Sequence, residues 1–272
     1  MKKNYFIMNG TKLFIILVIN TLCLSAQEIV NRYEYNDNYS VIPKSVLAIG
    51  NDLIIPFSII KNDEKKAGLL LCNTDNTIKD AVLFEGENDY VINQVIESKN
   101  GNLLVAAEGY SNEGQESLYF IELEMDKFRI VNDFVFNEGG NELDPFSILE
   151  VSNKNVLIGG FVKRKELVSN SFYNMFSEKQ MIYIGEFSKE GEKSWSKAID
   201  LIDYEKGICN AMVKVDDGIV MLCHANKIGE ERMSIVLIKV DFNGDIQNII
   251  KVNNPDFITK GGVTQLSGDD LI

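Results

Sequence analysis

Residues 212–252 read MVKVDDGIVMLCHANKIGEERMSIVLIKVDFNGDIQNIIKV. Two continuous apolar runs in this stretch, Ile219–Cys223 and Ser234–Val240, are typical of strands that are covered on both faces. Each run is flanked by a tight-turn sequence, Asp216–Gly218 before the first and Asp241–Gly244 after the second. The stretch therefore predicts four antiparallel strands, which is the make-up of a propeller blade. The expected strands are Met212–Val215, Ile219–Cys223, Ser234–Val240 and Asp245–Val252.

The same unit recurs along the chain. Its first hairpin is repeated at Val46–Ile55, Val95–Ala106, Ile148–Gly159 and Val263–Ile272. The residue after each turn marks the repeat at Leu53, Leu103, Val156, Ile219 and Leu271, in steps of 50, 53, 63 and 52 residues. The turns of the second hairpin, at Asn76, Lys127, Gly191 and Gly244, give independent steps of 51, 64 and 53 residues. A strand repeat of about 50 residues indicates an all-β fold, a β-propeller built of four-stranded blades.

The repeats occupy residues 27–272, and the ring is expected to be incomplete in this chain. Leu271 and Ile272 stop partway through the second strand of a new unit. At the other end, Arg32–Asn36 alternates like an outer strand and resembles Asp133–Asn137. We therefore expect about four blades and a partial one, with further strands supplied by a longer protein.

Both sets of markers contain one long step, which predicts an insertion of about ten residues in the third blade. The polar segment Lys165–Glu178 is the best place for it, and it is expected to be a loop. Phe172, Tyr173 and Phe176 lie in this segment. Exposed aromatic side chains commonly contact carbohydrate or protein ligands, so these three are candidate ligand-binding residues. The alternative is that they fold back over the edge of the blade.

Residues 1–26 are typical of an export signal. Lys2, Lys3 and Lys12 precede or open the apolar run Leu13–Leu24, which is too short to span a bilayer comfortably. Cleavage after residue 25 or 26 is the first reading. A lipoprotein anchored at Cys23 is the second, because Leu22 stands where a small residue is preferred. No later segment reaches transmembrane length, so we expect an exported protein in the periplasm, on the outer surface or outside the cell.

The charge of the chain argues against a nucleic-acid partner. The formal net charge is −13 at pH 7, and the expected signal contains three lysines and no acid, so its removal makes the charge more negative. Nucleic-acid binding requires a basic surface. A protein or a carbohydrate is the partner class that the composition leaves open, and the oligomeric state is not determined by the sequence.

One turn has the residue types of a calcium loop. Asp241, Asn243 and Asp245 supply alternating oxygen ligands. However, Gly244 falls one place earlier than in such loops, and no acid follows at the twelfth position. A hairpin turn is therefore the preferred interpretation, and a calcium ion is the alternative.

Few residues in the chain suit catalysis. His224 is the only histidine, which excludes a multi-histidine metal site within this chain, and it is interpreted as a strand-end residue. Beyond the signal the cysteines are Cys72, Cys209 and Cys223. Small buried strand residues are the preferred interpretation, with a disulfide between the last two as the alternative. Carboxylate pairs fall in turns, so no catalytic set is expected.

Two stretches resemble a known repeat. Gly185–Asp200 (GEFSKEGEKSWSKAID) and Lys239–Asn248 (KVDFNGDIQN) are similar to the repeat of secreted β-propellers of Bacteroidetes type, a family often associated with type IX secretion. The shared pattern is a strand, a turn with glycine, and then Trp-x-Lys, matched here by Trp195 and Lys197. The span Glu186–Trp195 also resembles the tryptophan-docked blades of quinoprotein propellers, with packing as the preferred role. The resemblance implies a propeller at the cell surface.

The sequence therefore predicts an exported β-propeller that acts as a binding or scaffold module. The alternative is an extracellular carbohydrate-active enzyme, a hydrolase or lyase, with carboxylates at the propeller channel. Such an enzyme would place two carboxylates roughly 5–9 Å apart in one cleft.

Overall fold

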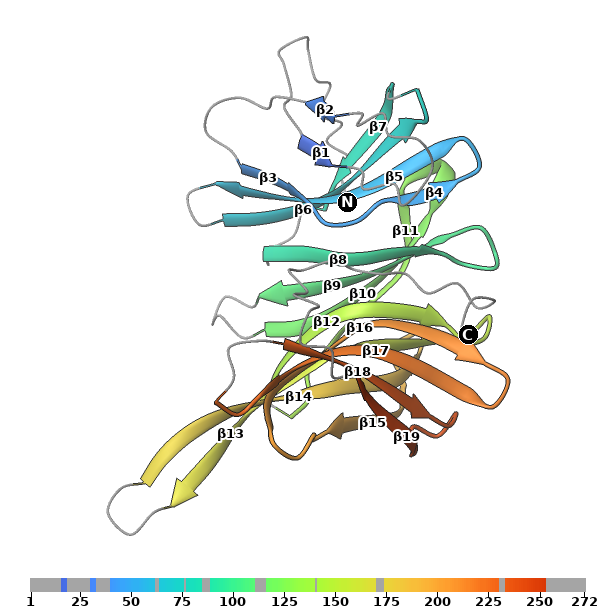
Figure 1. The fold of residues 1–272 in the computed structure, drawn as a ribbon. Coiled ribbons are helices and arrows are strands. Elements are labelled where there is room, and N and C mark those ends of the chain that lie inside the picture. Colours follow the sequence, from blue (N-terminus) through green and yellow to red (C-terminus); the bar gives the residue numbers. More distant parts are fainter. Residues whose placement is uncertain are drawn as a thin grey trace. The chain divides into compact units, whose positions relative to one another are not determined.

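The computed structural model describes residues 16–18, 30–32, 40–61, 64–75, 77–84, 89–110, 116–139, 141–169, 174–229 and 233–252. Apart from the 3₁₀ helix η1 (Met125–Lys127), every element in these ranges is a β-strand (Figure 1). Within them, no helix has the length and apolar character that a membrane crossing requires. The chain divides into two compact units, residues 1–95 and 96–272, and each is described by itself.

The first unit contains a short two-stranded sheet and one blade-like sheet. In the short sheet, β1 (Ile16–Val18) pairs with β2 (Val30–Arg32). In the larger sheet, β3 and β4 both pair with β5, and the order continues through β6 to β7. These strands are β3 (Ser40–Pro43), β4 (Leu47–Ile49), β5 (Asp52–Lys61), β6 (Glu64–Asn73) and β7 (Ile78–Leu83). Because β3 and β4 together make one interrupted first strand, this sheet has the four-strand plan that the repeat predicts.

Three antiparallel meanders of four strands follow. The first has the order β8–β9–β10–β11, and the division between the units falls within β8. Its strands are β8 (Asp89–Glu97), β9 (Leu103–Tyr110), β10 (Glu116–Glu124) and β11 (Arg129–Phe136). The second runs through β12 (Glu142–Glu150), β13 (Asn155–Ser169), β14 (Asn174–Ser188) and β15 (Lys193–Ile199). The third runs through β16 (Tyr204–Val215), β17 (Gly218–Lys227), β18 (Met233–Val240) and β19 (Ile246–Val252).

The hairpins predicted from the repeat are confirmed. The first-hairpin markers Leu103, Val156 and Ile219 fall at the first or second residue of β9, β13 and β17. The second-hairpin turns at Lys127, Gly191 and Gly244 separate the third strand of each meander from the fourth. Markers Asn76 and Leu271 lie outside the described residues, as do residues 33–39 and 253–272, which carry the expectations for the two ends of the propeller.

The insertion in the third blade is not a loop, and that expectation was wrong. Strands β13 and β14 continue through it, with Lys165 opposite Glu178 and Ser169 opposite Asn174 (Figure 1). The polar composition of Lys165–Glu178 suggested a loop because a core strand would need an apolar face. A polar composition does not prevent backbone groups from pairing across a hairpin, and that pairing alone makes this segment a strand ribbon.

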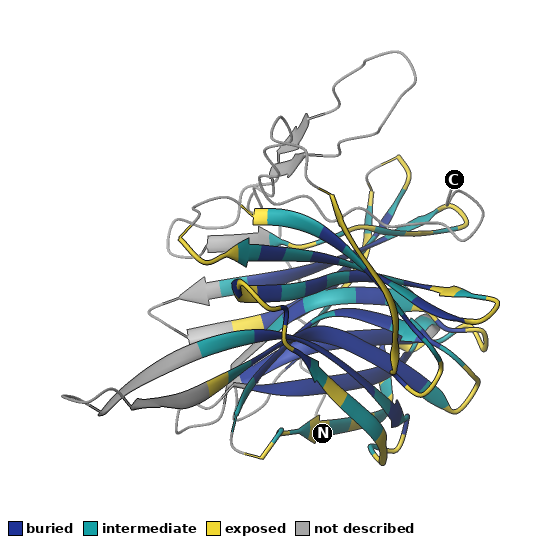
Figure 2. Ribbon diagram, turned by 60° about the horizontal axis from the view of Figure 1, so that its bottom comes forward, coloured by how far each residue is buried: buried dark blue, intermediate teal, exposed yellow. Residues whose placement is uncertain are grey.

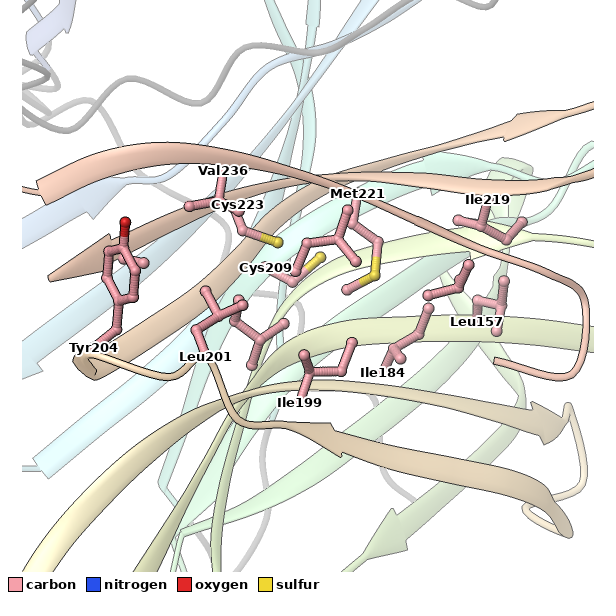
Figure 3. Packing of buried hydrophobic residues seen from close by; sticks show 14 residues of the cluster. Leu157, Ile184, Ile199, Leu201, Tyr204, Cys209, Ile219, Met221, Cys223 and Val236 are labelled. Carbon is pink, nitrogen blue, oxygen red and sulfur yellow. The ribbon is translucent and has the colours of Figure 1, made fainter. Parts of the chain in front are cut away.

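The core of the second unit lies between successive four-stranded meanders. The meanders β12–β15 and β16–β19 are also joined at one edge, where β14 pairs with β16 in parallel at Gln180 and Lys206. One apolar cluster joins the β8–β11 meander to the β12–β15 meander, through residues such as Leu118, Phe120, Tyr183 and Phe187. A second cluster joins β12–β15 to β16–β19 (Figure 3). Figure 2 shows buried positions along the middle of the strands and exposed positions at the turns. Four-stranded meanders packed face to face through apolar layers are propeller blades, so the all-β propeller prediction is confirmed.

Candidate functional site

Of the three predicted aromatic residues, the structure describes only Phe176. Phe172 and Tyr173 lie outside the described residues. Phe176 lies on β14 opposite Leu167, in the extension of the hairpin, and its side chain is not described. Their role as ligand-binding residues therefore stays a prediction.

The predicted metal residues form the turn between β18 and β19. Asp241 accepts hydrogen bonds through Oδ1 from the backbone N–H groups of Asn243 and Asp245, each at 2.9 Å. The carboxylate of Asp245 pairs with Lys197 Nζ at 3.0 Å. The hairpin turn is thus confirmed, and in the described ranges no three His, Cys, Asp or Glu side chains group to hold a metal ion. A calcium ion held partly by Asn243 stays a prediction.

The Trp-x-Lys motif of the third blade contacts this turn of the fourth blade. Gly244 has φ +79° and lies so close to the ring of Trp195 that a Cβ would overlap the ring. Lys197, two residues further along β15, holds Asp245 of the same turn. The blade before repeats the arrangement, because a Cβ on Gly191 would come within 2.9 Å of Phe134 on β11. Trp195 therefore packs blades together, as the preferred interpretation held.

The indole also holds a carboxylate. Trp195 donates from Nε1 to Oε2 of Glu186 at 2.8 Å, and Asn155 donates from Nδ2 to Oε1 at 2.6 Å. Glu186 lies near the end of β14, opposite Leu157 near the start of β13. Two donors, one on each oxygen, fix the orientation of this carboxylate.

Glu186 lines a cleft between the third and fourth blades. The cleft has a volume of about 300 Å³ and lies at the end of the blades where their hairpin turns meet. Lys214 on β16 and Phe242 in the β18–β19 turn face it from the fourth blade. The lining residues are Val151, Ser152, Asn155, Leu157, Glu186, Lys214 and Phe242.

The two charged side chains of the cleft form some hydrogen bonds within the protein and keep others for a ligand. Lys214 donates to the backbone carbonyl of Val151 at 3.3 Å, and its Nζ stands 5.5 Å from the ring centre of Phe242. An ammonium group has three donors, and an ionised carboxylate has about four acceptor positions. Lys214 and Glu186 therefore keep donors and acceptors for a ligand. Phe242 is 43% exposed and supplies an apolar surface beside these two charged side chains.

A second cluster of charged groups is internal. Lys189, in the β14–β15 turn, contacts Glu150 at 2.9 Å and Glu122 at 3.5 Å, and all three side chains are at most 6% exposed. Ser98 and the backbone N–H of Lys99 also donate to Glu150, each at 2.7 Å. Burial alone would raise the pKa of Glu150, but these two donors and Lys189 together hold the pKa below its usual value.

This internal cluster joins blades rather than offering a reaction site. Glu122 lies on β10 in the second blade, whereas Glu150 and Lys189 belong to the third. Glu122 also accepts from Asn102 at 2.8 Å and Asn100 at 3.2 Å. The two carboxylates are close together, but they are closed off from water and neutralised in part by one lysine. Sequence reasoning missed Lys189, because nothing in its turn points to partners 39 and more residues away.

His224, Cys209 and Cys223 lie in the first two strands of the fourth blade, whereas Cys72 lies in the first unit. His224 donates a hydrogen bond from Nδ1 to Asn210 Oδ1 at 2.8 Å, and burial lowers the pKa of its imidazole. Cys209 and Cys223 are buried free thiols on neighbouring strands, and Cys72 is a buried free thiol in the first unit. The interpretation of the three cysteines as small buried strand residues agrees with their burial. The interpretation of His224 as a strand-end residue was wrong, because β17 continues to Lys227 and His224 lies within it, opposite Ile208 and Ile235.

No protein-family model matches the chain, and neither does any curated protein. Among solved structures, the native arabinanase Arb43A of Bacillus subtilis is similar over 76% of this chain and 75% of its own, with 14% identity and a TM-score of 0.45. An exo-1,5-alpha-L-arabinanase from a bovine ruminal metagenomic library matches 76% of this chain and 77% of its own, with 11% identity and a TM-score of 0.44.

A puromycin hydrolase is similar over 80% of this chain but only 31% of its own, with 10% identity and a TM-score of 0.41. At these scores the similarities decide nothing about function, and no residue role passes from these proteins to this chain.

Proposed function

We propose that this protein is an exported binding module that holds a neutral saccharide unit in the cleft between its third and fourth blades. The observation that carries the proposal is the convergence of Glu186, Lys214 and Phe242 on one open space of about 300 Å³. Small-molecule sites are typically concave, largely apolar, and supplied with a few fixed polar groups. This cleft has that composition.

The chemistry of the lining favours a neutral, polyhydroxylated ligand. Glu186 can accept from hydroxyl groups and Lys214 can donate to them, while Phe242 offers its ring to the C–H face of a sugar. A ligand with a negative charge would lie beside Glu186, and one with a positive charge would lie beside Lys214. A neutral saccharide meets both groups without repulsion.

The turn that carries Phe242 is held in place before any ligand arrives. Asp241 caps two backbone N–H groups of the turn, Lys197 pairs with Asp245, and Gly244 rests on Trp195. A side chain that is already ordered loses little conformational entropy on binding. This rigidity supports a binding role for Phe242 over a role as a loose surface residue.

Export supports a saccharide as the ligand class. The basic start and short apolar run within residues 1–26 are the features that suggest a position outside the cytoplasm, where free and polymeric saccharides are common ligands of surface proteins. The net charge of −13 disfavours polyanionic ligands such as nucleic acids.

The test is a calorimetric titration with a panel of neutral pentoses, hexoses and their short oligomers. We expect at least one neutral saccharide to bind, and Phe242→Ala and Lys214→Met each to weaken that binding by about 10-fold, the equivalent of about 1.4 kcal/mol. Glucuronate and glucosamine of matched size should bind more weakly than the neutral sugar.

Two variants outside the cleft serve as controls. Ile228→Ala removes an apolar side chain that is 65% exposed, and Lys239→Met removes a lysine that pairs with Asp217 in a neighbouring turn. Both should bind like the wild type. The proposal is wrong if the cleft variants also bind like the wild type, or if no neutral saccharide in the panel binds.

Cleavage of the bound saccharide is the alternative function. It would need a second carboxylate near Glu186, and in the described part of the chain Glu186 is the one acid that lines the cleft. The same panel incubated with the protein and assayed for new reducing ends distinguishes the two. Release of reducing ends that is lost in Glu186→Gln would establish an enzyme in place of a binding module.

A further inference from the structure

Two thiols of the fourth blade face each other across neighbouring strands. Cys209 on β16 and Cys223 on β17 are paired directly in the strand register. Both residues are 0% exposed. Figure 3 shows their sulfur atoms next to each other inside the apolar cluster between the third and fourth blades.

The spacing of the two residues suits a covalent bond. Residues directly opposite in an antiparallel pair have Cα atoms about 4.5–5.5 Å apart. A disulfide spans Cα separations of about 4.4–6.8 Å. Cys209 Sγ lies 3.6 Å from Ser147 Oγ and 3.7 Å from the carbonyl oxygen of Ala211, so its side chain is already ordered. The strand register therefore places the two cysteines at a backbone separation that a disulfide can span.

We propose that Cys209 and Cys223 form an intramolecular disulfide when the chain folds in an oxidising environment. The bond joins β16 to β17, the first hairpin of the fourth blade, which also carries Lys214 of the cleft. The export signal expected in residues 1–26 would deliver the chain to a compartment where disulfides form. The proposal does not depend on the ligand of the cleft.

The two thiols can be oxidised by exchange with a small-molecule disulfide, which serves as the oxidant. The thiolate of one cysteine attacks a sulfur of the oxidant, whose S–S bond breaks and releases one thiolate that takes up a proton. The second cysteine, as its thiolate, then attacks the protein sulfur of the mixed disulfide. The Cys209–Cys223 bond forms, and a second thiol leaves with the remaining proton. Two protein thiols are oxidised, and one disulfide is reduced to two thiols.

The order of events follows from burial. Attack requires a thiolate, and burial raises the pKa of Cys223, with the neighbouring Cys209 adding to the effect. Since neither sulfur is accessible in the folded blade, the bond is expected to form during folding, before the third and fourth blades close over the cluster. The reduced, folded protein should react slowly with the same oxidant.

The experiment refolds the full chain from denaturant in a mixture of reduced and oxidised glutathione. Free thiols are then blocked with N-ethylmaleimide in fresh denaturant, and the peptides are mapped by mass spectrometry. We expect the peptides of Cys209 and Cys223 to be linked, with a mass lower by two hydrogen atoms, and Cys72 to carry the maleimide. Cys72 is the matched control, because it is also buried but faces Leu53 and Ile78 on the neighbouring strands.

Maleimide on both Cys209 and Cys223 after oxidative refolding would overturn the proposal, and so would a link from either to another cysteine. A second measurement compares thermal unfolding with and without a reductant, followed by fluorescence of Trp195, the only tryptophan. A loop of about 15 residues closed by a disulfide predicts a midpoint several degrees lower on reduction. The drop should vanish in Cys209→Ser, and an equal drop in that variant contradicts the bond.

Discussion

Replacing Lys189 by methionine should destabilise the second unit strongly, although the residue lies in a turn. The substitution keeps the length of the side chain and removes its charge. Two carboxylates, on Glu122 and Glu150, then remain at no more than 6% exposure without a counter-charge. Removing one partner of a buried ion pair typically costs about 3–5 kcal/mol.

The remaining contacts place the expected cost at the lower end of that range. Glu150 keeps its hydrogen bonds from Ser98 and the N–H of Lys99, and Glu122 keeps those from Asn100 and Asn102. Each carboxylate therefore loses its counter-charge but not its remaining donors. We expect a loss of about 3 kcal/mol in the free energy of unfolding. With an m value of about 2 kcal/mol/M, the urea midpoint falls by about 1.5 M.

Fluorescence of Trp195 provides the assay, because this single tryptophan lies in the third blade and reports on the second unit. Lys239→Met is the matched control, because its ion pair with Asp217 is exposed to solvent and should contribute little to stability. Adding Glu122→Gln and Glu150→Gln to Lys189→Met should recover part of the loss, since no buried charge is then left unpaired. A shift for Lys189→Met no larger than the control's would refute the reasoning.

Two further predictions concern the same unit. The pKa of Glu150 is lowered in the folded state, so its contribution to stability is present above the unfolded pKa of about 4.3 and is lost as the pH falls through the folded value. Acid titration followed by Trp195 fluorescence should therefore show a loss of stability that the Glu150→Gln variant lacks. Identical acid profiles of the two proteins would contradict this prediction. Gly244→Ala should cost about 2–5 kcal/mol in urea unfolding, because a Cβ would strain the backbone at φ +79° and also overlap Trp195. Gly229→Ala, at φ +78° with open space around it, should cost only about 1–2 kcal/mol, and equal costs would show that the Trp195 contact does not matter.

The blade pattern could be predicted because it depends on turn residues and apolar runs that are close together in the sequence. Tight turns at Asp217–Gly218 and at Gly244 separate apolar runs, and both kinds of signal depend on a few adjacent residues. The same local reasoning failed at Lys165–Glu178, where polar composition suggested a loop. This segment is a strand because its backbone pairs across the hairpin, with Lys165 opposite Glu178, and composition does not reveal such a pairing.

The candidate site could be predicted only in fragments. The sequence singled out the span Glu186–Trp195, but as a packing motif. It also singled out the turn that contains Phe242, but as a possible metal site. Their common cleft depends on one contact within the third blade, between Asn155 and Glu186, which are 31 residues apart. It also depends on one contact between blades, from Lys214 to Val151, which are 63 residues apart. No local spacing rule connects these residues, because the contacts are set by strand register and by how consecutive blades stack.

The most direct test of the saccharide site uses the indole N–H signal of Trp195 in a ¹⁵N-labelled sample. The chain has one tryptophan, so the spectrum contains a single such signal, and its N–H donates to Glu186 at the wall of the cleft. We predict that titration with the neutral saccharide panel shifts this signal in a saturable way for at least one member, and that the shift is lost in Phe242→Ala. An indole signal that stays in place while a saccharide binds would put the binding site elsewhere and contradict the account.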